Sequence, residues 1–197
     1  MYYYYNLVCG HNQLFVSAIR DNYYRGFDLF MSILEKFVER LRELLTDHEM
    51  KPAHLAKELG VTRKVICRYT NGERLPSLNM AFRLSGYFHC SIDFLLGRSD
   101  EGSEFEPLPL PPFKDRLPYL VDFFKKTKAN ISKEAHIDES IIYDWLKGRS
   151  TPSLESIIAL ADYFDCSVEF VLGRENYKHP KPAFCLYSLD SFGYIPL

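Results

Sequence analysis

The amino-acid sequence predicts an all-α protein built from two tandem five-helix modules joined by a proline-rich linker. Three observations support this prediction. The second half of the chain repeats the first, apolar residues recur at three- and four-residue steps, and prolines and acids gather between the two copies. Because each copy holds about 60 residues, each is large enough to fold around a core of its own.

The internal repeat emerges when Phe37 is placed on Phe113, since the alignment then continues without a gap until Arg98 falls on Arg174. Of the 62 aligned positions, 21 are identical, far more than an arbitrary offset gives. Pro76-Ser77-Leu78, for example, falls on Pro152-Ser153-Leu154. The predicted order is therefore an extension (1–32), a first module (33–98), a linker (99–112), a second module (113–174) and a tail (175–197).

Each module carries the same succession of helix starts and stops. In the first module, Thr62 can cap a third helix that runs to about Thr70, and Gly72 ends it in a left-handed turn. Ser91 can cap a short fifth helix with Asp93 in its first turn, where the helix dipole favours an acid. The apolar spacing predicts the buried face of each remaining helix. The first helix buries Phe37, Leu41, Leu44 and Leu45, and the second buries Ala53, Ala56 and Leu59. The fourth helix buries Leu78, Ala81, Phe82, Ser85 and Phe88.

The linker Ser99–Pro112 holds four prolines and four acids in 14 residues. A segment of this composition cannot bury a core of its own, and its prolines favour extended backbone. We therefore expect an extended, semi-rigid connection between the modules. The second module repeats the helix signals of the first, with Trp145 in the core, and Cys90 and Cys166 as small core residues at equivalent positions.

Composition narrows the classes of function. The 197 residues carry 24 Lys and Arg against 26 Asp and Glu, a net charge of −2, which excludes a uniformly basic nucleic-acid coat but not a local basic patch. The five cysteines form no C-x-x-C pair, which favours a reducing cytoplasm over a disulfide framework. No apolar stretch of about 18 residues predicts a membrane span. The sequence also lacks a P-loop, an HExxH motif, a nucleophile elbow and metal-ligand spacing, so we expect no enzyme, no metal and no cofactor.

The segment Lys51–Arg74 has the pattern of two short helices joined by a tight turn at Gly60-Val61-Thr62. Its sequence, KPAHLAKELGVTRKVICRYTNGERLPSL when extended to Leu78, resembles the helix-turn-helix of the Cro and lambda-type phage repressors, the Xre family. The resemblance extends to the fifth helix at Ser91–Gly97 and covers both modules, although ANISKEAHID departs from it in the second. It implies lambda-repressor-like modules and a sequence-specific DNA-binding transcriptional regulator, a repressor, from a bacterium, its phage or a mobile element.

The third helix of the first module carries the residues that would meet DNA. A recognition helix enters the major groove with its N-terminal residues facing base edges, and Arg and Lys suit the O6 and N7 of guanine. By the resemblance, Arg63, Lys64 and Arg68 occupy the base-reading positions, and Cys67 shares their outer face, where its thiol is idle or a redox switch. The residues expected to hold phosphates are Lys51, Thr62, Asn71 and Arg74.

Charge separates the two modules. Gly60–Arg74 carries four bases and one acid, a net charge of +3, whereas His136–Ser150 carries two bases and three acids, a net charge of −1. Because acids on a helix that enters the groove repel phosphates, we expect the second module to pair two chains into a homodimer rather than to read bases. The acids are Asp138, Glu139 and Asp144, and the residues still expected to touch the DNA backbone are Lys128, Lys147 and Arg149.

Two further interpretations stay open. The modules can be protein-interaction units of the antitoxin or anti-repressor kind, which fits the acidic helix but does not require three bases on the other. Alternatively, both modules bind one DNA as a covalent pseudo-dimer, which the reach of the linker allows and the acidic helix disfavours.

The N-terminal residues 1–30 precede Met31, which has the pattern of a natural start of the first module. We expect residues 1–30 to form either an upstream extension or a strand or helix packed on a module.

Overall fold

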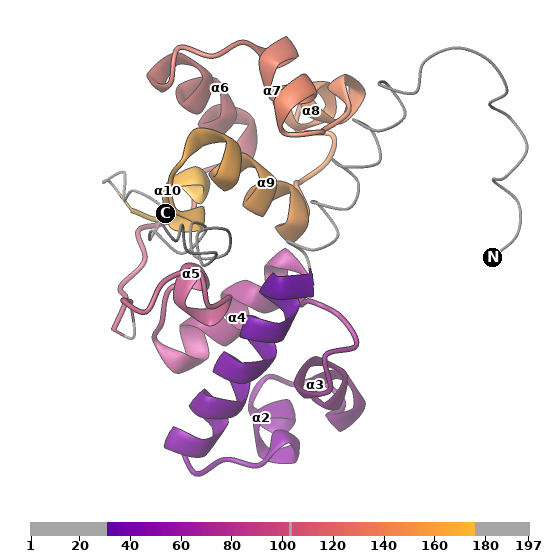
Figure 1. Cartoon of the computed structure of the whole chain (residues 1–197), viewed down its shortest axis with the longest axis vertical. Coiled ribbons are helices and arrows are strands. Elements are labelled where there is room, and N and C mark those ends of the chain that lie inside the picture. The colour runs from indigo at the N-terminus through magenta and orange to yellow at the C-terminus, as the bar shows by residue number, and fades with distance from the viewer. Residues whose placement is uncertain (1–30, 103, 176–197) are drawn as a thin grey trace, which may run out of the picture.

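The computed structural model describes residues 31–102 and 104–175 (Figure 1). All regular structure within these ranges is helical, which confirms the predicted all-α fold. The helices form two modules that follow one another along the long axis of the molecule. Residues 1–30 of the predicted extension and residues 176–197 of the predicted tail lie outside the described residues.

The two modules repeat the same helices. In the first, a helix over residues 31–47 precedes α2 (Pro52–Glu58), α3 (Arg63–Thr70), α4 (Leu78–Phe88) and α5 (Ile92–Leu95). In the second, α6 (Phe113–Phe123) precedes α7 (Lys128–Glu134), α8 (Glu139–Leu146), α9 (Leu154–Phe164) and α10 (Val168–Leu172). The alignment of the two copies carries the bounds of α2, α3 and α4 onto those of α7, α8 and α9. The repeat seen in the sequence is therefore a repeat of structure.

Serine caps begin the last two helices of both modules. The Ser91 hydroxyl accepts a hydrogen bond from the backbone N–H of Phe94 at 3.0 Å, as predicted, and Ser77 does the same for Met80 at 3.3 Å. Each bond satisfies a backbone donor that has no partner within the helix. Thr62 occupies the cap position of α3, but its side chain makes no capping bond. The predicted Thr62 cap is therefore wrong as a side-chain contact, although the helix starts where expected.

The core follows the predicted faces with small differences. Trp145, Cys90 and Cys166 are buried, as expected for core residues. In α2, however, Ala53 is exposed and Leu55 is buried, because a helix that begins at Pro52 turns residues 55, 56 and 59 toward the core. In α4 the predicted inward residues Leu78 and Phe82 are half-buried, whereas Met80 and Leu84 are buried.

The two modules meet at α5 and α10, near the middle of the molecule (Figure 1). Asp93 Oδ2 accepts hydrogen bonds from the backbone N–H groups of Val168 at 2.8 Å and Glu169 at 3.3 Å, at the start of α10. In return, Glu169 Oε1 accepts from the N–H of Ile92 at 2.6 Å, at the start of α5. Asp93 and Glu169 are equivalent in the repeat, as are Ile92 and Val168. The contact is therefore reciprocal, like that of a two-fold dimer interface.

Two equivalent arginines complete this interface. Arg98 pairs with Asp93 at 3.0 Å within its own module and with Asp162 of α9 at 2.9 Å. Arg174 lies 3.4 Å from Glu169, and its guanidinium lies over the ring of Phe82 in α4, 5.1 Å from the centroid. All of these ionisable side chains except Asp162 are less than a tenth exposed. Removing one partner of such a pair leaves a buried charge uncompensated, so the set acts as a unit.

The linker lies along this interface. The N–H of Ser91 donates to the carbonyl of Gly102 at 2.9 Å, and the N–H of Phe105 donates to the carbonyl of His89 at 2.8 Å. Further along, the N–H of Leu108 donates to the carbonyl of Arg174 at 2.9 Å. The described part of 99–112 holds no helix or strand, yet its backbone is tied to both modules and helps to fix their arrangement.

The buried acid Glu169 predicts a specific pH dependence of stability. Burial raises the pKa of Glu169 from 4.5 to about 7, opposed by Arg174 and assisted by Asp93 and Glu175. Its Oε2 accepts no hydrogen bond among the described residues, which also disfavours the charged form. Because the folded state holds this proton more tightly than the unfolded state, stability should fall as pH rises from about 4.5 to about 7.

The test compares Glu169→Gln with the unaltered chain by denaturant unfolding at several pH values. The introduced amide keeps an acceptor for the N–H of Ile92 but cannot ionise. Between pH 5 and 8 the unaltered chain should lose on the order of 2–3 kcal/mol more free energy of unfolding than the variant. Parallel pH profiles for the two chains would show that Glu169 does not titrate in this range.

Candidate nucleic-acid interface

The helices α2 and α3 pack against each other through a tight turn. The turn begins at Gly60, whose φ of +57° is the left-handed conformation that glycine adopts without a steric penalty. The N–H of Val61 donates to the carbonyl of Ala56 at 2.9 Å and closes the turn. Ile66 and Tyr69 bury one face of α3 in the core, so the opposite face is directed outward.

Two arginines support the helix-turn-helix, one at the end of α2 and one at the end of α3. The Arg83 guanidinium on α4 donates to the carbonyl of Leu59, just before the turn. Arg42, on the helix over residues 31–47, donates from Nη2 to the carbonyl of Thr70 at 2.5 Å, at the end of α3. Neither residue is marked by a sequence signal, because a bond to a backbone carbonyl needs no partner of a particular type. These contacts hold α3 against the rest of the first module.

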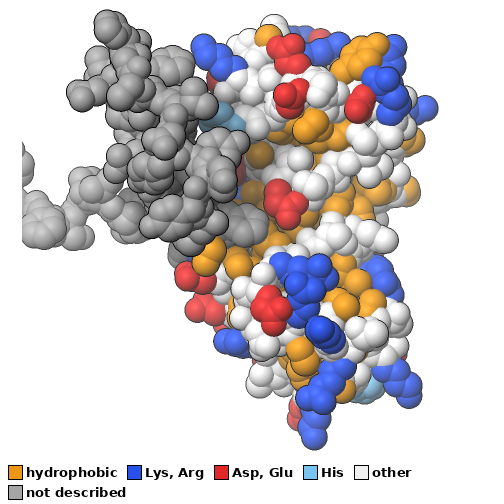
Figure 2. All heavy atoms as spheres, turned by 90° about the vertical axis from the view of Figure 1, so that its right-hand side faces the viewer, with side chains coloured by type: hydrophobic (Ala, Val, Ile, Leu, Met, Phe, Trp, Pro, Cys, Tyr) orange, Lys and Arg blue, Asp and Glu red, His pale blue; other side chains and the backbone are white. Residues whose placement is uncertain are grey.

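The predicted base-reading residues share the outward face of α3. Arg63 and Lys64 are exposed, and neither forms an ion pair within the described part of the chain. Cys67 and Arg68 are partly exposed, and Arg68 Nε donates to Glu73 Oε2 at 2.9 Å. Lys and Arg side chains gather in the lower half of the face shown in Figure 2, over the first module. This face carries a concentrated positive charge with one acid beside it.

The residues predicted to hold phosphates surround the two helices. Thr62 and Asn71 lie at the two ends of α3, and Lys51 lies just before the first residue of α2. Arg74 follows α3, with its guanidinium carbon 5.5 Å from the centroid of the Tyr69 ring. All four side chains are exposed. They can therefore contact a polyanion along the edges of α3 without any rearrangement of the core.

In the second module, α8 stands where α3 stands in the first, and its acids are largely engaged. Asp138 caps α8, with Oδ1 accepting from the N–H of Ser140 at 2.8 Å. Hydrogen bonding by the side chain and the backbone of Ser140 lowers the pKa of Asp138. Asp144 forms an ion pair with Arg149 at 2.8 Å. By the repeat, Asp144 and Arg149 are the equivalents of Arg68 and Glu73. The second module therefore carries the same ion pair with its charges inverted.

The outward face of α8 also carries apolar side chains. Ile141 is 44% exposed and Tyr143, the equivalent of Cys67, is 52% exposed. The Tyr143 ring lies near two of the predicted backbone contacts, with Lys147 Nζ at 5.4 Å and the guanidinium carbon of Arg149 at 5.1 Å from its centroid. The third predicted contact, Lys128, is the first residue of α7. This face thus combines an aromatic ring, an aliphatic side chain and flanking cations.

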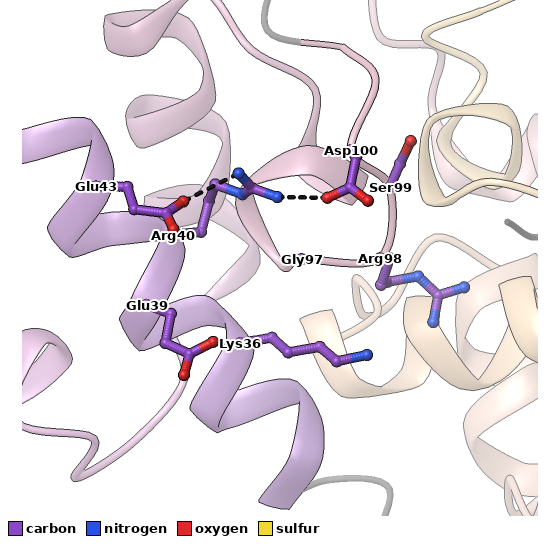
Figure 3. Close-up of a pocket in the computed structure, with 8 residues that line it drawn as sticks. All are labelled: Lys36, Glu39, Arg40, Glu43, Gly97, Arg98, Ser99 and Asp100. Atoms are coloured by element: carbon purple, nitrogen blue, oxygen red, sulfur yellow. Dashed lines mark hydrogen bonds and ion pairs between the residues drawn. The ribbon is translucent and has the colours of Figure 1, made fainter. Parts of the chain in front are cut away.

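A pocket of about 180 Å³ lies between the helix over residues 31–47 and the segment 97–100 (Figure 3). Arg40 extends across it and pairs with Glu43 at 3.0 Å and Asp100 at 2.8 Å. In Figure 3 the side chains of Lys36 and Arg98 extend toward the second module. Arg40 thus ties the helix over residues 31–47 to the start of the linker, and Arg98 at the rim of the pocket pairs with Asp162 of the second module.

Metal-binding clusters and membrane spans are both absent from the described ranges. Residues 31–102 and 104–175 hold no cluster of three or more His, Cys, Asp or Glu side chains that could bind a metal ion. Within the same ranges, none of the helices combines the length and the apolar character needed to cross a bilayer.

Comparisons with known proteins find a helix-turn-helix in each module. A family model described as "Helix-turn-helix" matches residues 41–95 and 124–171, one match in each module. An uncharacterized HTH-type transcriptional regulator of Archaeoglobus fulgidus is 34% identical over 62 residues, which are 32% of this chain and 89% of the relative. A crystal structure of a transcriptional regulator from Listeria innocua aligns with 59% of this chain and 96% of its own, at 24% identity and a TM-score of 0.30.

The burial of the cysteines predicts which thiol reacts. Cys67 on α3 is partly exposed, whereas burial raises the pKa of Cys90 to about 12 and Cys166 is fully buried. Because the thiolate is the reactive form, iodoacetamide at pH 8 should alkylate Cys67 alone in a folded Cys9→Ser/Cys185→Ser chain. Mass spectrometry should show one adduct in the native state and three in urea. Equal labelling of Cys67 and Cys90 in the native state would contradict the assigned burial.

Proposed function

The chain belongs to the helix-turn-helix family, of the Xre and lambda-repressor type, and from this premise we propose that it is a transcriptional regulator that reads double-stranded DNA with α3. In this proposal α3 enters the major groove, as second helices of helix-turn-helix units do. Arg63, Lys64 and Arg68 contact base edges, and guanine O6 and N7 are the acceptors that suit them.

The observation that carries the proposal is the division of α3 into two faces. Ile66 and Tyr69 are buried, and the opposite face exposes bases on a helix whose end is held by Arg42. Arg83 holds the end of α2, just before the turn that leads into this helix. A helix fixed in this way can present its side chains to a groove without first being ordered, which lowers the entropic cost of binding. A solvated charged helix would need neither the tight turn nor these two supports.

Arg68 needs an exchange of partners to read a base. Its Nε is hydrogen-bonded to Glu73 at 2.9 Å, and both side chains are about half exposed. An exposed pair of this kind contributes little to stability, about 0–1 kcal/mol, so a guanine can replace the carboxylate at small cost. Glu73 also repels phosphates, which weakens binding to every duplex. DNA sites that offer Arg68 a base acceptor offset this repulsion, and other sites do not.

The phosphate contacts position the helix. We assign them to Lys51, Thr62, Asn71 and Arg74, which are exposed around α2 and α3. Contacts of this type fix the register of a protein on the duplex but carry no sequence information. Each cation that neutralises a phosphate also releases a counterion, which makes the affinity fall with salt.

Substitution of the base-reading arginines tests the proposal. Arg63→Ala or Arg68→Ala should weaken binding to the preferred duplex by about 1–3 kcal/mol and relax the preference at one base pair. The measurement is selection of bound duplexes from a random pool by each full-length variant, followed by fluorescence anisotropy on the selected sites.

Two further variants separate base contacts from simple charge. Arg63→Lys keeps the charge but loses the two-pronged guanidinium, so it should lose specificity with a nearly unchanged salt slope. Lys51→Ala should weaken binding to all sequences alike and reduce the slope of log K against log salt by about 0.9. Unchanged base preference in both arginine-to-alanine variants would contradict the assignment of α3.

A second candidate function is protein interaction through α8. The exposed Ile141 and Tyr143 favour it, because apolar side chains on a helix face are typical of contacts with proteins. In that case Ile141→Ala would abolish partner binding and leave DNA binding through α3 unchanged.

Three expectations from the sequence stay predictions. They are repression as the regulatory outcome, a cytoplasmic location, and a homodimer formed through the second module.

A further inference from the structure

We propose that one chain binds one duplex as an intramolecular pseudo-dimer, with α3 in one half-site and α8 in a second, different half-site. The inference rests on the proposed function and adds the class of DNA that is bound. That class is an asymmetric site whose two unlike halves have centres about one helical turn, or 10 bp, apart. In this arrangement the second module takes the place that a second copy would take in a two-fold dimer.

The first support is the symmetry of the interface. Asp93 binds the start of α10, and its equivalent Glu169 binds the start of α5. Arg98 reaches Asp162 on α9, and its equivalent Arg174 reaches Ser85 on α4, with Nη2 and Oγ 3.4 Å apart. Reciprocal contacts between equivalent residues require that the modules be related by a rotation close to two-fold. A two-fold relation between two helix-turn-helix units is the arrangement with which dimers of this type read two half-sites on one duplex.

The second support is the position of the two helices. In Figure 1, α3 and α8 both lie on the right-hand side of the molecule, one in each module. Figure 2 views that side directly and shows Lys and Arg over the first module, with acidic, apolar and basic side chains over the second. A straight duplex laid along the long axis on this side would meet both helices.

The acids of α8 argue against binding of this helix to DNA, because they repel phosphates. Two of them are engaged within the second module. Asp138 is used as the cap of α8, and Asp144 is neutralised by Arg149. Asp144 therefore presents no uncompensated charge to a duplex, and the carboxylate of Asp138 is engaged by the start of its own helix. Lys147 and Arg149 flank the Tyr143 ring, and Lys128 begins α7, so cations border α8 as they border α3. The net charge of the segment thus understates how well this face tolerates phosphates.

The chemistry of α8 specifies what the second half-site contains. Glu139 and Ser140 stand at the positions of Arg63 and Lys64, and a carboxylate accepts a hydrogen bond from the N4 amino group of cytosine. Ile141 and Tyr143 supply exposed apolar surface, which suits the methyl group of thymine. The first half-site should therefore hold guanines that face α3, and the second should hold cytosine and thymine that face α8.

The interface also sets the stoichiometry. α5 and α10 cover each other, and the carboxylates of Asp93 and Glu169 are nearly completely buried. A second copy cannot use these surfaces unless the modules of each chain separate. Separation would expose backbone donors and break paired buried charges, and the linker raises the effective concentration of one module at the other, so the closed chain is favoured at low protein concentration.

The experiment uses the full-length chain and duplexes selected from a random pool. We expect a motif with two unlike blocks about 10 bp apart, and sedimentation velocity with a labelled duplex should show one chain per duplex. A palindromic motif bound by two chains would overturn the pseudo-dimer and leave the proposed function intact. No selection of any motif would overturn both.

Spacing and surface variants then test the role of α8. Insertion of 5 bp between the blocks moves the second block to the opposite side of the duplex, and affinity should fall to that of a duplex lacking this block. Glu139→Ala/Tyr143→Ala should lose enrichment of the second block alone and bind the selected site at least about tenfold more weakly.

Asp122→Ala on α6 is the matched control, because it also removes one exposed acid from the second module and lies outside α8. It should bind as the unaltered chain does. Equal binding by the α8 variant and this control, or affinity that is indifferent to the 5-bp insertion, would show that α8 does not engage DNA in a fixed register.

Discussion

The arrangement of the whole molecule depends on the reciprocal contact between Asp93 and Glu169. Asp93 accepts from two backbone N–H groups at the start of α10, and Glu169 accepts from one at the start of α5. Because both groups are buried, neither module can be removed without leaving unpaired polar groups in the other. The interface therefore sets the directions in which α3 and α8 face relative to each other.

The two modules have similar cores and different surfaces. Trp145 and Tyr69 fill equivalent core positions, and both third helices end at a glycine with positive φ. The outer faces diverge in charge, and the ion pair Arg68–Glu73 is inverted in Asp144–Arg149. Two equal scaffolds with unlike surfaces are suited to two unlike binding tasks on one partner, which a homodimer of identical modules cannot provide.

The sequence predicted the helices well because their signals are local. Serine caps, glycine stops and apolar spacing act within a few residues, and the internal repeat doubled each signal. The sequence does not predict the interface between the modules, because the residues that contact each other there are distant in the chain. Asp93 was expected to stabilise its own helix, whereas it binds the start of α10, 75 residues away. The repeat aligns Arg98 with Arg174, but it does not show that each arginine contacts the other module.

The basic face of α3 was also accessible from the sequence, since the family motif fixes which residues point outward. The supports at the end of α2 and at the end of α3 are not, because Arg83 and Arg42 donate to backbone carbonyls that no residue type marks. The net charge of −1 over His136–Ser150 does not describe how the acids of α8 are used. A charge count does not show that Asp138 caps a helix or that Asp144 is paired.

A distance measurement between α3 and α8 tests most directly whether the modules form one rigid unit. Spin labels on Cys67 and on a Tyr143→Cys variant, in a Cys9→Ser/Cys185→Ser background, report the separation by pulsed electron resonance without any DNA. We expect a single narrow distribution centred on the separation of these two positions in the structure. A broad distribution would mean that the linker merely tethers independent modules, and it would contradict an interface that fixes α3 and α8 relative to each other.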